Sequence, residues 1–367
     1  MRSLIVLVIT WLVAASAAAG TPEIFRDPED GKLDLSNWLL ERHGWLPVPV
    51  FITDPALGYG LGVALASFHR HEGTGPDGRP IPPSITGVGG LYTETHTWGA
   101  AAGHLGIWKR DTIRYRGGIG YADANLEFYL DNRPLDYNLR GGFLMQSLEF
   151  RVGGSGFFVG PRYVLFRSSA RFADPVGIPG VDPNHDFANG GLAVDTSFDN
   201  RDNMLSPTKG NNLGLGLTRY DKAFGGDYDY WQLDADLRTY HHLSSEWFLN
   251  VRFDGAATDG DVPFYALPYI VLRGVPSLRY QGQDAASVET EVRWQLVPRW
   301  SVLAFAGLGR TWRGDTRLGQ NETAVSGGAG FRYLIARELG LRGGIDIARG
   351  PEEWVFYIQM GHAWGGR

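Results

Sequence analysis

The sequence predicts an all-β protein, a transmembrane antiparallel β-barrel of about sixteen strands with a short N-terminal helix. Three observations lead to this prediction: an export signal, segments that alternate between apolar and polar residues, and an unusual composition. The 367 residues include 51 glycines, 12 tryptophans, 16 tyrosines and 19 phenylalanines. Much glycine and much aromatic surface suit a barrel in which only alternate residues meet lipid. A soluble β-sandwich or propeller would share the alternation and the composition.

Residues 1–19 form the predicted signal peptide. Arg2 supplies the positive start, residues 4–13 the apolar core and residues 17–19 the small-residue cleavage site. The apolar run is shorter than the roughly 20 residues that a spanning helix needs. The chain has no cysteine, so export brings no disulfides, and its net charge of -6 makes nucleic acid an unexpected partner.

Residues 20–50 are predicted to be a short periplasmic segment, and residues 51–367 the barrel. A helix is expected within 33–47, where Asp34 or Ser36 can cap its start and Gly44 can end it. The alternative for this stretch is a flexible lead-in, because so short a helix is marginal by itself.

Strands are predicted from a period of two in hydrophobicity, since successive side chains of a strand point to opposite faces. The clearest segments are 231–238, 247–254 and 288–296. In a soluble sandwich their apolar faces would form the core. In a membrane barrel those faces meet lipid, and the charged faces line a wet lumen. The export signal and the turn pattern favour the barrel.

The predicted connections alternate between short and long, as in barrels with periplasmic turns and outer loops. The expected turns lie at 95–96, 153–154, 243–244 and 298–299, and the expected loops at 70–83, 173–188 and 258–284. Counting strands from Gly58 gives about sixteen, at roughly 20 residues for each strand with its connection.

Two stretches carry a family resemblance. The first, 195–217, contains the pattern D-x-R-D-x-x-x-x-P-x-x-G, formed by Asp199, Arg201, Asp202, Pro207 and Gly210. The second, 272–294, begins with Leu272, Arg273 and Gly274, which align with the [VI]-R-G-[FY] pattern. Both resemble the barrel of the outer-membrane insertase and translocase superfamily, of the BamA, TamA and two-partner secretion type. The resemblance covers roughly residues 50–367, and two separate motifs support it.

The resemblance implies that the sixth outer loop folds into the lumen, where its arginine pairs with a carboxylate of the inner wall. Glu291 is the preferred partner of Arg273, and Glu289 on the same face could substitute. A guanidinium in a partly dry lumen needs such an acidic partner. An exposed loop charge is the alternative interpretation of Arg273.

Two departures from the family pattern concern the same loop. Gly307 stands where the family places an aspartate, and Val275 replaces an aromatic residue. We therefore expect a weaker contact, or one that uses other acids. In addition, residues 20–50 are too short for a periplasmic POTRA domain, which needs at least about 50 residues. The resemblance thus implies a member without POTRA domains, unless a separate protein supplies them.

The seam between the first and last strands is predicted to be weak, because glycine destabilises strand interiors. Gly58, Gly60 and Gly62 fall in the expected first strand, and Gly361 and Trp364 lie near the last. The alternative is that these glycines only relieve crowding in a curved sheet.

The resemblance implies insertion or translocation of protein, or of another substrate, at the bacterial outer membrane. The alternatives are a pore-forming or structural barrel without insertase activity and, third, a barrel that binds partners through its outer loops. We expect no enzyme activity, cofactor or metal. The expected partners are outer-membrane lipid and lipopolysaccharide, and unfolded client proteins or a separate periplasmic subunit. The oligomeric state stays open.

Overall fold

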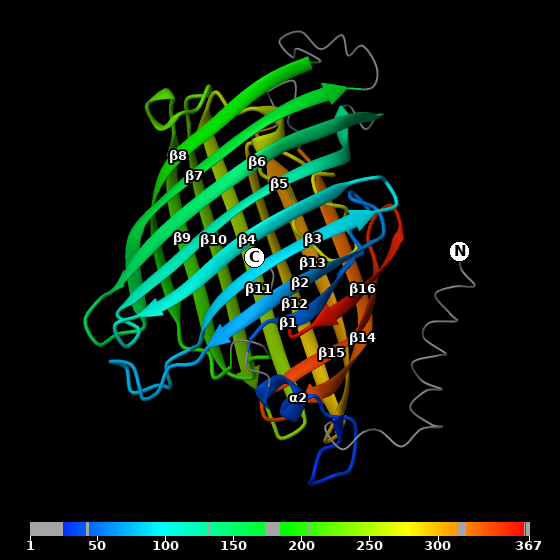
Figure 1. Cartoon of the computed structure of the whole chain (residues 1–367). Helices are drawn as coiled ribbons and strands as arrows, with labels where there is room; N and C mark the ends of the chain where they lie inside the picture. The colour runs from blue at the N-terminus through cyan, green and yellow to red at the C-terminus, as the bar shows by residue number, and fades with distance from the viewer. Residues whose placement is uncertain are drawn as a thin grey trace.

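The computed structural model describes residues 25–364 apart from 42–43, 131–132, 173–183, 204–205, 314–320 and 363. Its strands form one 16-stranded antiparallel sheet in sequence order, β1 to β16, and the sheet curls into a barrel (Figure 1). This confirms the predicted fold class. The predicted signal peptide, 1–19, lies outside the described residues.

The strands are β1 Leu46–Ile52, β2 Gly60–His69, β3 Ser84–Thr93, β4 Trp98–Trp108, β5 Ile113–Leu130, β6 Arg133–Arg151, β7 Phe157–Phe172, β8 Asn184–Asp199, β9 Gly210–Tyr220, β10 Tyr230–His242, β11 Trp247–Gly260, β12 Asp284–Val297, β13 Trp300–Trp312, β14 Thr323–Ala336, β15 Leu341–Arg349 and β16 Trp354–Met360. The helix α2 spans Ser36–Glu41. No helix within the described residues is long and apolar enough to span a membrane.

The two faces of the wall differ as the period of two predicts. Along β12, Val288, Val292 and Trp294 are exposed on the outer face, whereas Glu289 and Glu291 are buried on the inner face. Strand β13 alternates between exposed and buried residues over its whole length. The outer face is therefore the apolar one, and the lumen holds the charged side chains.

The first strand differs from the prediction. Strand β1 begins at Leu46, inside the segment expected to precede the barrel, and Gly60 and Gly62 belong to the second strand. Gly58 lies in the turn before β2, with a φ of +76°. This strand was not predicted because it contains Pro47 and Pro49, and proline in a sequence normally argues against a strand interior.

The two ends of the barrel are called here the base, where residues 25–41 lie, and the top, the opposite end (Figure 1). Because β1 was missed, the connection 70–83 was expected on the wrong side. It lies at the base, together with the turns at 153–154, 243–244 and 298–299, while the turn at 95–96 lies at the top.

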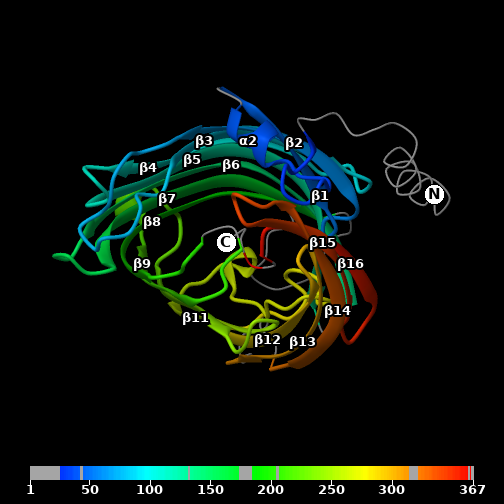
Figure 2. The same ribbon diagram turned by 90° about the horizontal axis from the view of Figure 1, so that it is seen from below.

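The wall is uneven in height. Strands β5 and β6 have 18 and 19 residues, whereas β1 and β16 have 7 each. The long strands lie on the side of the barrel nearest the viewer in Figure 1, and the short ones form the two ends of the sheet, which face each other in the view from below (Figure 2).

Candidate functional site

The connection between β11 and β12, residues 261–283, enters the lumen. Its apolar residues Ile270, Leu272, Val275 and Tyr280 are buried in one cluster with Ala324 of β14. This explains the apolar run at 269–272 in an otherwise polar region: the side chains pack against the inner wall. Val275 shares this packing.

Arg273 lies at the tip of this connection and is surrounded by carboxylates. Its Nε lies 2.9 Å from Glu289 Oε1, and its Nη1 lies 3.0 Å from Glu291 Oε2 and 2.8 Å from Asp346 Oδ2. The Glu291 contact is an ion pair without the alignment of a hydrogen bond. The side chains of Glu289 and Asp346 are 0% exposed and that of Arg273 is 5% exposed. These four residues are the Arg273 cluster.

Two further contacts position the guanidinium. Its carbon lies 3.6 Å from the ring centroid of Phe305, a cation–π stack on β13. Gly274 turns the chain with a φ of +88° and donates its N–H to Tyr357 Oη at 2.8 Å. A Cβ at Gly274 would meet Gly350 N at 2.9 Å, so the close approach as well as the dihedral angle requires glycine.

The departure at Gly307 has a structural counterpart on another strand. A Cβ at this position would lie 2.5 Å from Leu272 Cδ2, so the loop occupies the space of a side chain here. The additional carboxylate comes from Asp346 on β15, which Arg332 holds through two hydrogen bonds of 2.5 and 2.9 Å. Sequence reasoning missed Asp346 because nothing in the chain indicates which strand faces the loop tip.

Trp364 lies in the lumen and not at the end of the last strand where it was expected. It is 4% exposed, and its Nε1 donates to Glu289 Oε1 at 2.7 Å. Gly361 follows β16 directly with a φ of +80°, and its N–H donates to Arg342 O at 2.6 Å. Both residues therefore contact the interior or β15 and not the seam.

The seam is the place where β1 and β16 meet. Every other pair of neighbouring strands is hydrogen-bonded, but within the described strands no backbone pairing joins β1 to β16. One ring contact spans this region: Tyr59, in the connection between β1 and β2, stacks on Phe356 of β16 at 5.2 Å. The 261–283 loop also contacts the β1–β2 connection, where Ser277 N donates to Asp54 Oδ1 at 3.3 Å. The barrel is thus nearly closed, and the described parts of β1 and β16 face each other without backbone hydrogen bonds.

The turn between β8 and β9 holds the other predicted motif. Arg201 Nε and Nη2 donate to both carboxylate oxygens of Asp199, at 3.0 and 2.8 Å. Asp202 accepts from the backbone N–H of Thr208 at 2.9 Å, Pro207 is buried, and Gly210 has a φ of +106°. These contacts lie within the turn and stabilise it at the base.

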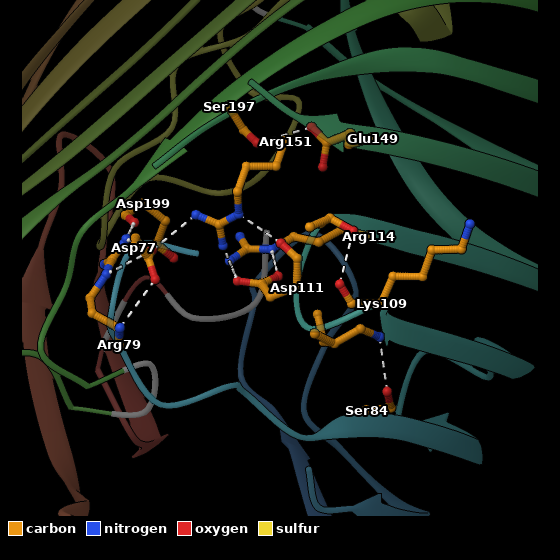
Figure 3. Close-up of polar contacts among 12 residues, drawn as sticks. Asp77, Arg79, Ser84, Lys109, Asp111, Arg114, Glu149, Arg151, Ser197 and Asp199 are labelled. Atoms are coloured by element: carbon orange, nitrogen blue, oxygen red, sulfur yellow. Dashed lines mark hydrogen bonds and ion pairs between the residues drawn. The ribbon is translucent and has the colours of Figure 1, made fainter. Parts of the chain in front are cut away.

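A second set of charged side chains lies at the base beside the β8–β9 turn, where Arg79 donates to Asp199 O at 2.7 Å (Figure 3). Arg151 has a fully buried side chain and lies 2.9 Å from Asp77 Oδ2 of the connection 70–83. It also pairs with Asp111, which accepts two hydrogen bonds from Arg114 at 2.7 and 2.9 Å. The guanidinium carbons of Arg114 and Arg151 lie over the ring of Phe158, at 4.0 and 4.4 Å from its centroid. The connection 70–83 is therefore tied to the inner wall.

Replacing Arg151 with alanine should release the connection 70–83. Asp77 and Asp111 would lose their shared cation, and removal of one partner of a buried pair costs about 3–5 kcal/mol. Amide hydrogen exchange over residues 70–83 should then become faster. Arg140→Ala is the control, because Arg140 forms an exposed ion pair with Asp123 and such pairs contribute about 0–1 kcal/mol. Equal exchange rates in the two variants would contradict the role of Arg151.

Arg299 is a further buried arginine of the base, and the sequence analysis did not predict its role either. Its guanidinium pairs with Asp27, Asp30 and Asp34, all from the N-terminal segment, and donates to Leu334 O at 3.1 Å. Burial would raise the pKa of Asp34, yet hydrogen bonds from Ser36 and Arg299 lower it. The hydrogen bond from Arg299 also lowers the pKa of Asp30. The three aspartates ahead of the barrel were the available signal.

Comparison with known families supports the architecture. Residues 115–270 match the model of the Omp85 superfamily domain. Over these residues the chain is similar to the Omp85 superfamily domain. The match includes the 199–210 turn and ends just before the Arg273 cluster, and it confirms the resemblance that the two motifs indicated. Omp85 barrels are outer-membrane proteins, and this chain has their fold.

Solved structures agree with the Omp85 assignment at the level of the fold. BamA from Haemophilus ducreyi lacking POTRA domains 1-3 has a TM-score of 0.60 at 14% identity, covering 87% of this chain and 70% of that one. CdiB from Acinetobacter baumannii and CdiB from Escherichia coli each have a TM-score of 0.57 at 11% identity. The alignments cover 86% and 85% of this chain but only 59% and 61% of the CdiB chains.

A search of curated proteins found no match to this chain. Within the described ranges, no group of three or more His, Asp or Glu side chains is arranged so that it could hold a metal ion.

Proposed function

We propose that this Omp85-type barrel inserts or translocates polypeptides at the outer membrane through the side of its wall, between β1 and β16. The observation that carries the proposal is the missing ladder between these two strands, in a sheet where all other neighbours pair. The occupied lumen supports the same route. A loop anchored by buried ion pairs obstructs passage along the barrel axis. A lateral opening between β1 and β16 would break fewer contacts than removal of this loop.

The proposal also implies which molecules contact the barrel from outside. The apolar outer face would contact outer-membrane lipid and lipopolysaccharide, and the substrate would be an unfolded client protein. The base would be the docking place for a separate periplasmic subunit. The ordered segment 25–41, held by Arg299, lies at that end and would contact such a subunit.

A reversible covalent bridge across the seam tests the proposal. Cysteines in place of Tyr59 and Phe356, whose rings stack across the seam, can be joined by a short cleavable cross-linker. We expect the bridge to abolish assembly of client barrels in vesicles, and its cleavage to restore assembly. The control is a pair at Leu233 and Ala257, which are register partners on two strands that are already hydrogen-bonded. Full activity of the bridged seam would contradict lateral passage.

A further inference from the structure

Strand β1 contains two prolines whose backbone groups point to the same side of the strand. In an antiparallel ladder, the N–H and C=O of one residue point to the same neighbouring strand, and alternate residues point to opposite neighbours. Pro47 and Pro49 are two residues apart, so both face the same side. Proline has no N–H, and its ring fills the space of the missing hydrogen. One edge of β1 therefore lacks an N–H donor at these two positions.

The hydrogen bonds of the next strand show which edge this is. Glu94 N donates to Tyr59 O at 2.8 Å, so the odd positions of β2 face β3 and its even positions face β1. Gly60 and Gly62 pair with Ile52 and Val50. The even positions of β1 thus point to β2, and Pro47, Pro49 and Phe51 point to the seam. Within β1, Phe51 alone offers an N–H there.

The facing edge of β16 has a full set of groups. Gly361 N donates to Arg342 O at 2.6 Å, which places the odd positions of β16 toward β15. Its even positions face the seam, each with one N–H and one C=O. They are Trp354, Phe356, Ile358 and Met360. Direct closure against β1 would supply one donor, from Phe51, for these four carbonyls.

We propose that the seam edge of β16, and not that of β1, is the docking strand for an extended segment of the client polypeptide. The inference rests on the proposed function and specifies which strand the substrate meets. At membrane depth an unbonded backbone group costs several kcal/mol. Acyl chains have no donors, whereas an added β-strand supplies an N–H and a C=O at every second residue, as in β-augmentation.

The side chains of β16 define the kind of segment that fits. Trp354 and Met360 are 63% and 42% exposed on the outer face, while Tyr357 and Gln359 face inward. A docked strand continues the same pleat, so it should place apolar side chains outward and polar side chains inward in alternation. The expected ligand is therefore an amphipathic β-strand, the pattern of a membrane barrel strand.

A photo-reactive peptide tests the choice of strand. The probe is a ten-residue peptide of alternating valine and threonine with a central photo-reactive group, added to the full chain in lipid vesicles. We expect the cross-links to fall on β16. Ile358→Pro removes one seam N–H without touching the β15 ladder, and should lower the yield about fivefold to tenfold. Phe51→Pro removes one seam N–H from β1 and should leave the yield unchanged. Heat-dependent mobility on gels shows that each variant is folded.

A gain of donors gives the complementary test. Pro47→Val together with Pro49→Val provides β1 with two additional N–H groups toward the seam. We expect direct pairing with β16 and a fall in peptide cross-linking. Cross-links on β1, an unchanged yield in Ile358→Pro, or cross-links between the β16 strands of two copies would each overturn the inference. If the bridged seam blocks activity while the peptide does not choose β16, this inference fails and the proposed lateral route stands.

Discussion

Replacing Arg273 with alanine should destabilise the barrel by about 3–5 kcal/mol, because Glu289, Glu291 and Asp346 would remain buried without their shared cation. The loop should leave the lumen in part of the population. We expect a lower midpoint of denaturant unfolding in detergent, and a small, flickering conductance of the native chain in planar bilayers that rises in the variant. A large, stable conductance of the native chain would instead support a pore.

Two variants make this test specific. Arg273→Lys keeps the charge, but one ammonium cannot reproduce the planar fork that contacts several carboxylates, so an intermediate loss of stability is expected. Arg171→Ala removes an exposed arginine paired with Asp186 and should change stability by less than about 0.5 kcal/mol. If Arg273→Ala behaved like Arg171→Ala, the loop would not be anchored by its arginine.

Replacing Arg299 with alanine should release the N-terminal segment from the base. Asp27 and Asp34 are buried beside this guanidinium, so its loss should cost near the lower end of about 3–5 kcal/mol, since the cluster lies at the rim. Limited proteolysis should then cut within residues 25–41, while the barrel keeps its heat-dependent gel mobility. The control is Lys32→Ala, which changes an exposed side chain of the same segment. Protection of the segment in Arg299→Ala would contradict this docking.

The wall was predictable because its signal is local. A period of two identifies strands such as β10 and β12, and the predicted export signal favours the interpretation in which the apolar face meets lipid. Strand β1 was missed for a local reason as well, since Pro47 and Pro49 are tolerated only because the strand lies at the edge of the sheet. Because β1 was missed, the connection 70–83 was also predicted to be an outer loop, whereas it lies at the base.

The site was predictable only in part, because its residues come from distant strands. Glu289 and Glu291 lie on the strand directly after the loop. Because alternate residues of this strand point into the lumen, both side chains are expected near Arg273. Asp346 lies 73 residues away from Arg273, and its position depends on the register of three further strands. The contacts of Arg299 with residues 27–34 likewise join parts of the chain that are far apart in the sequence. Sequence periodicity carries no information on such distances.

The tip of the 261–283 loop touches the end of the sheet as well as its middle. Gly274 donates to Tyr357 on β16, and Asp346 on the adjacent β15 shares Arg273 with β12. A molecule that bound the outer part of the loop and withdrew its tip would therefore also remove a restraint from the last strand. Such linkage is reciprocal in free energy. We thus expect occupation of the last strand to change how tightly an antibody against this loop binds from outside the cell.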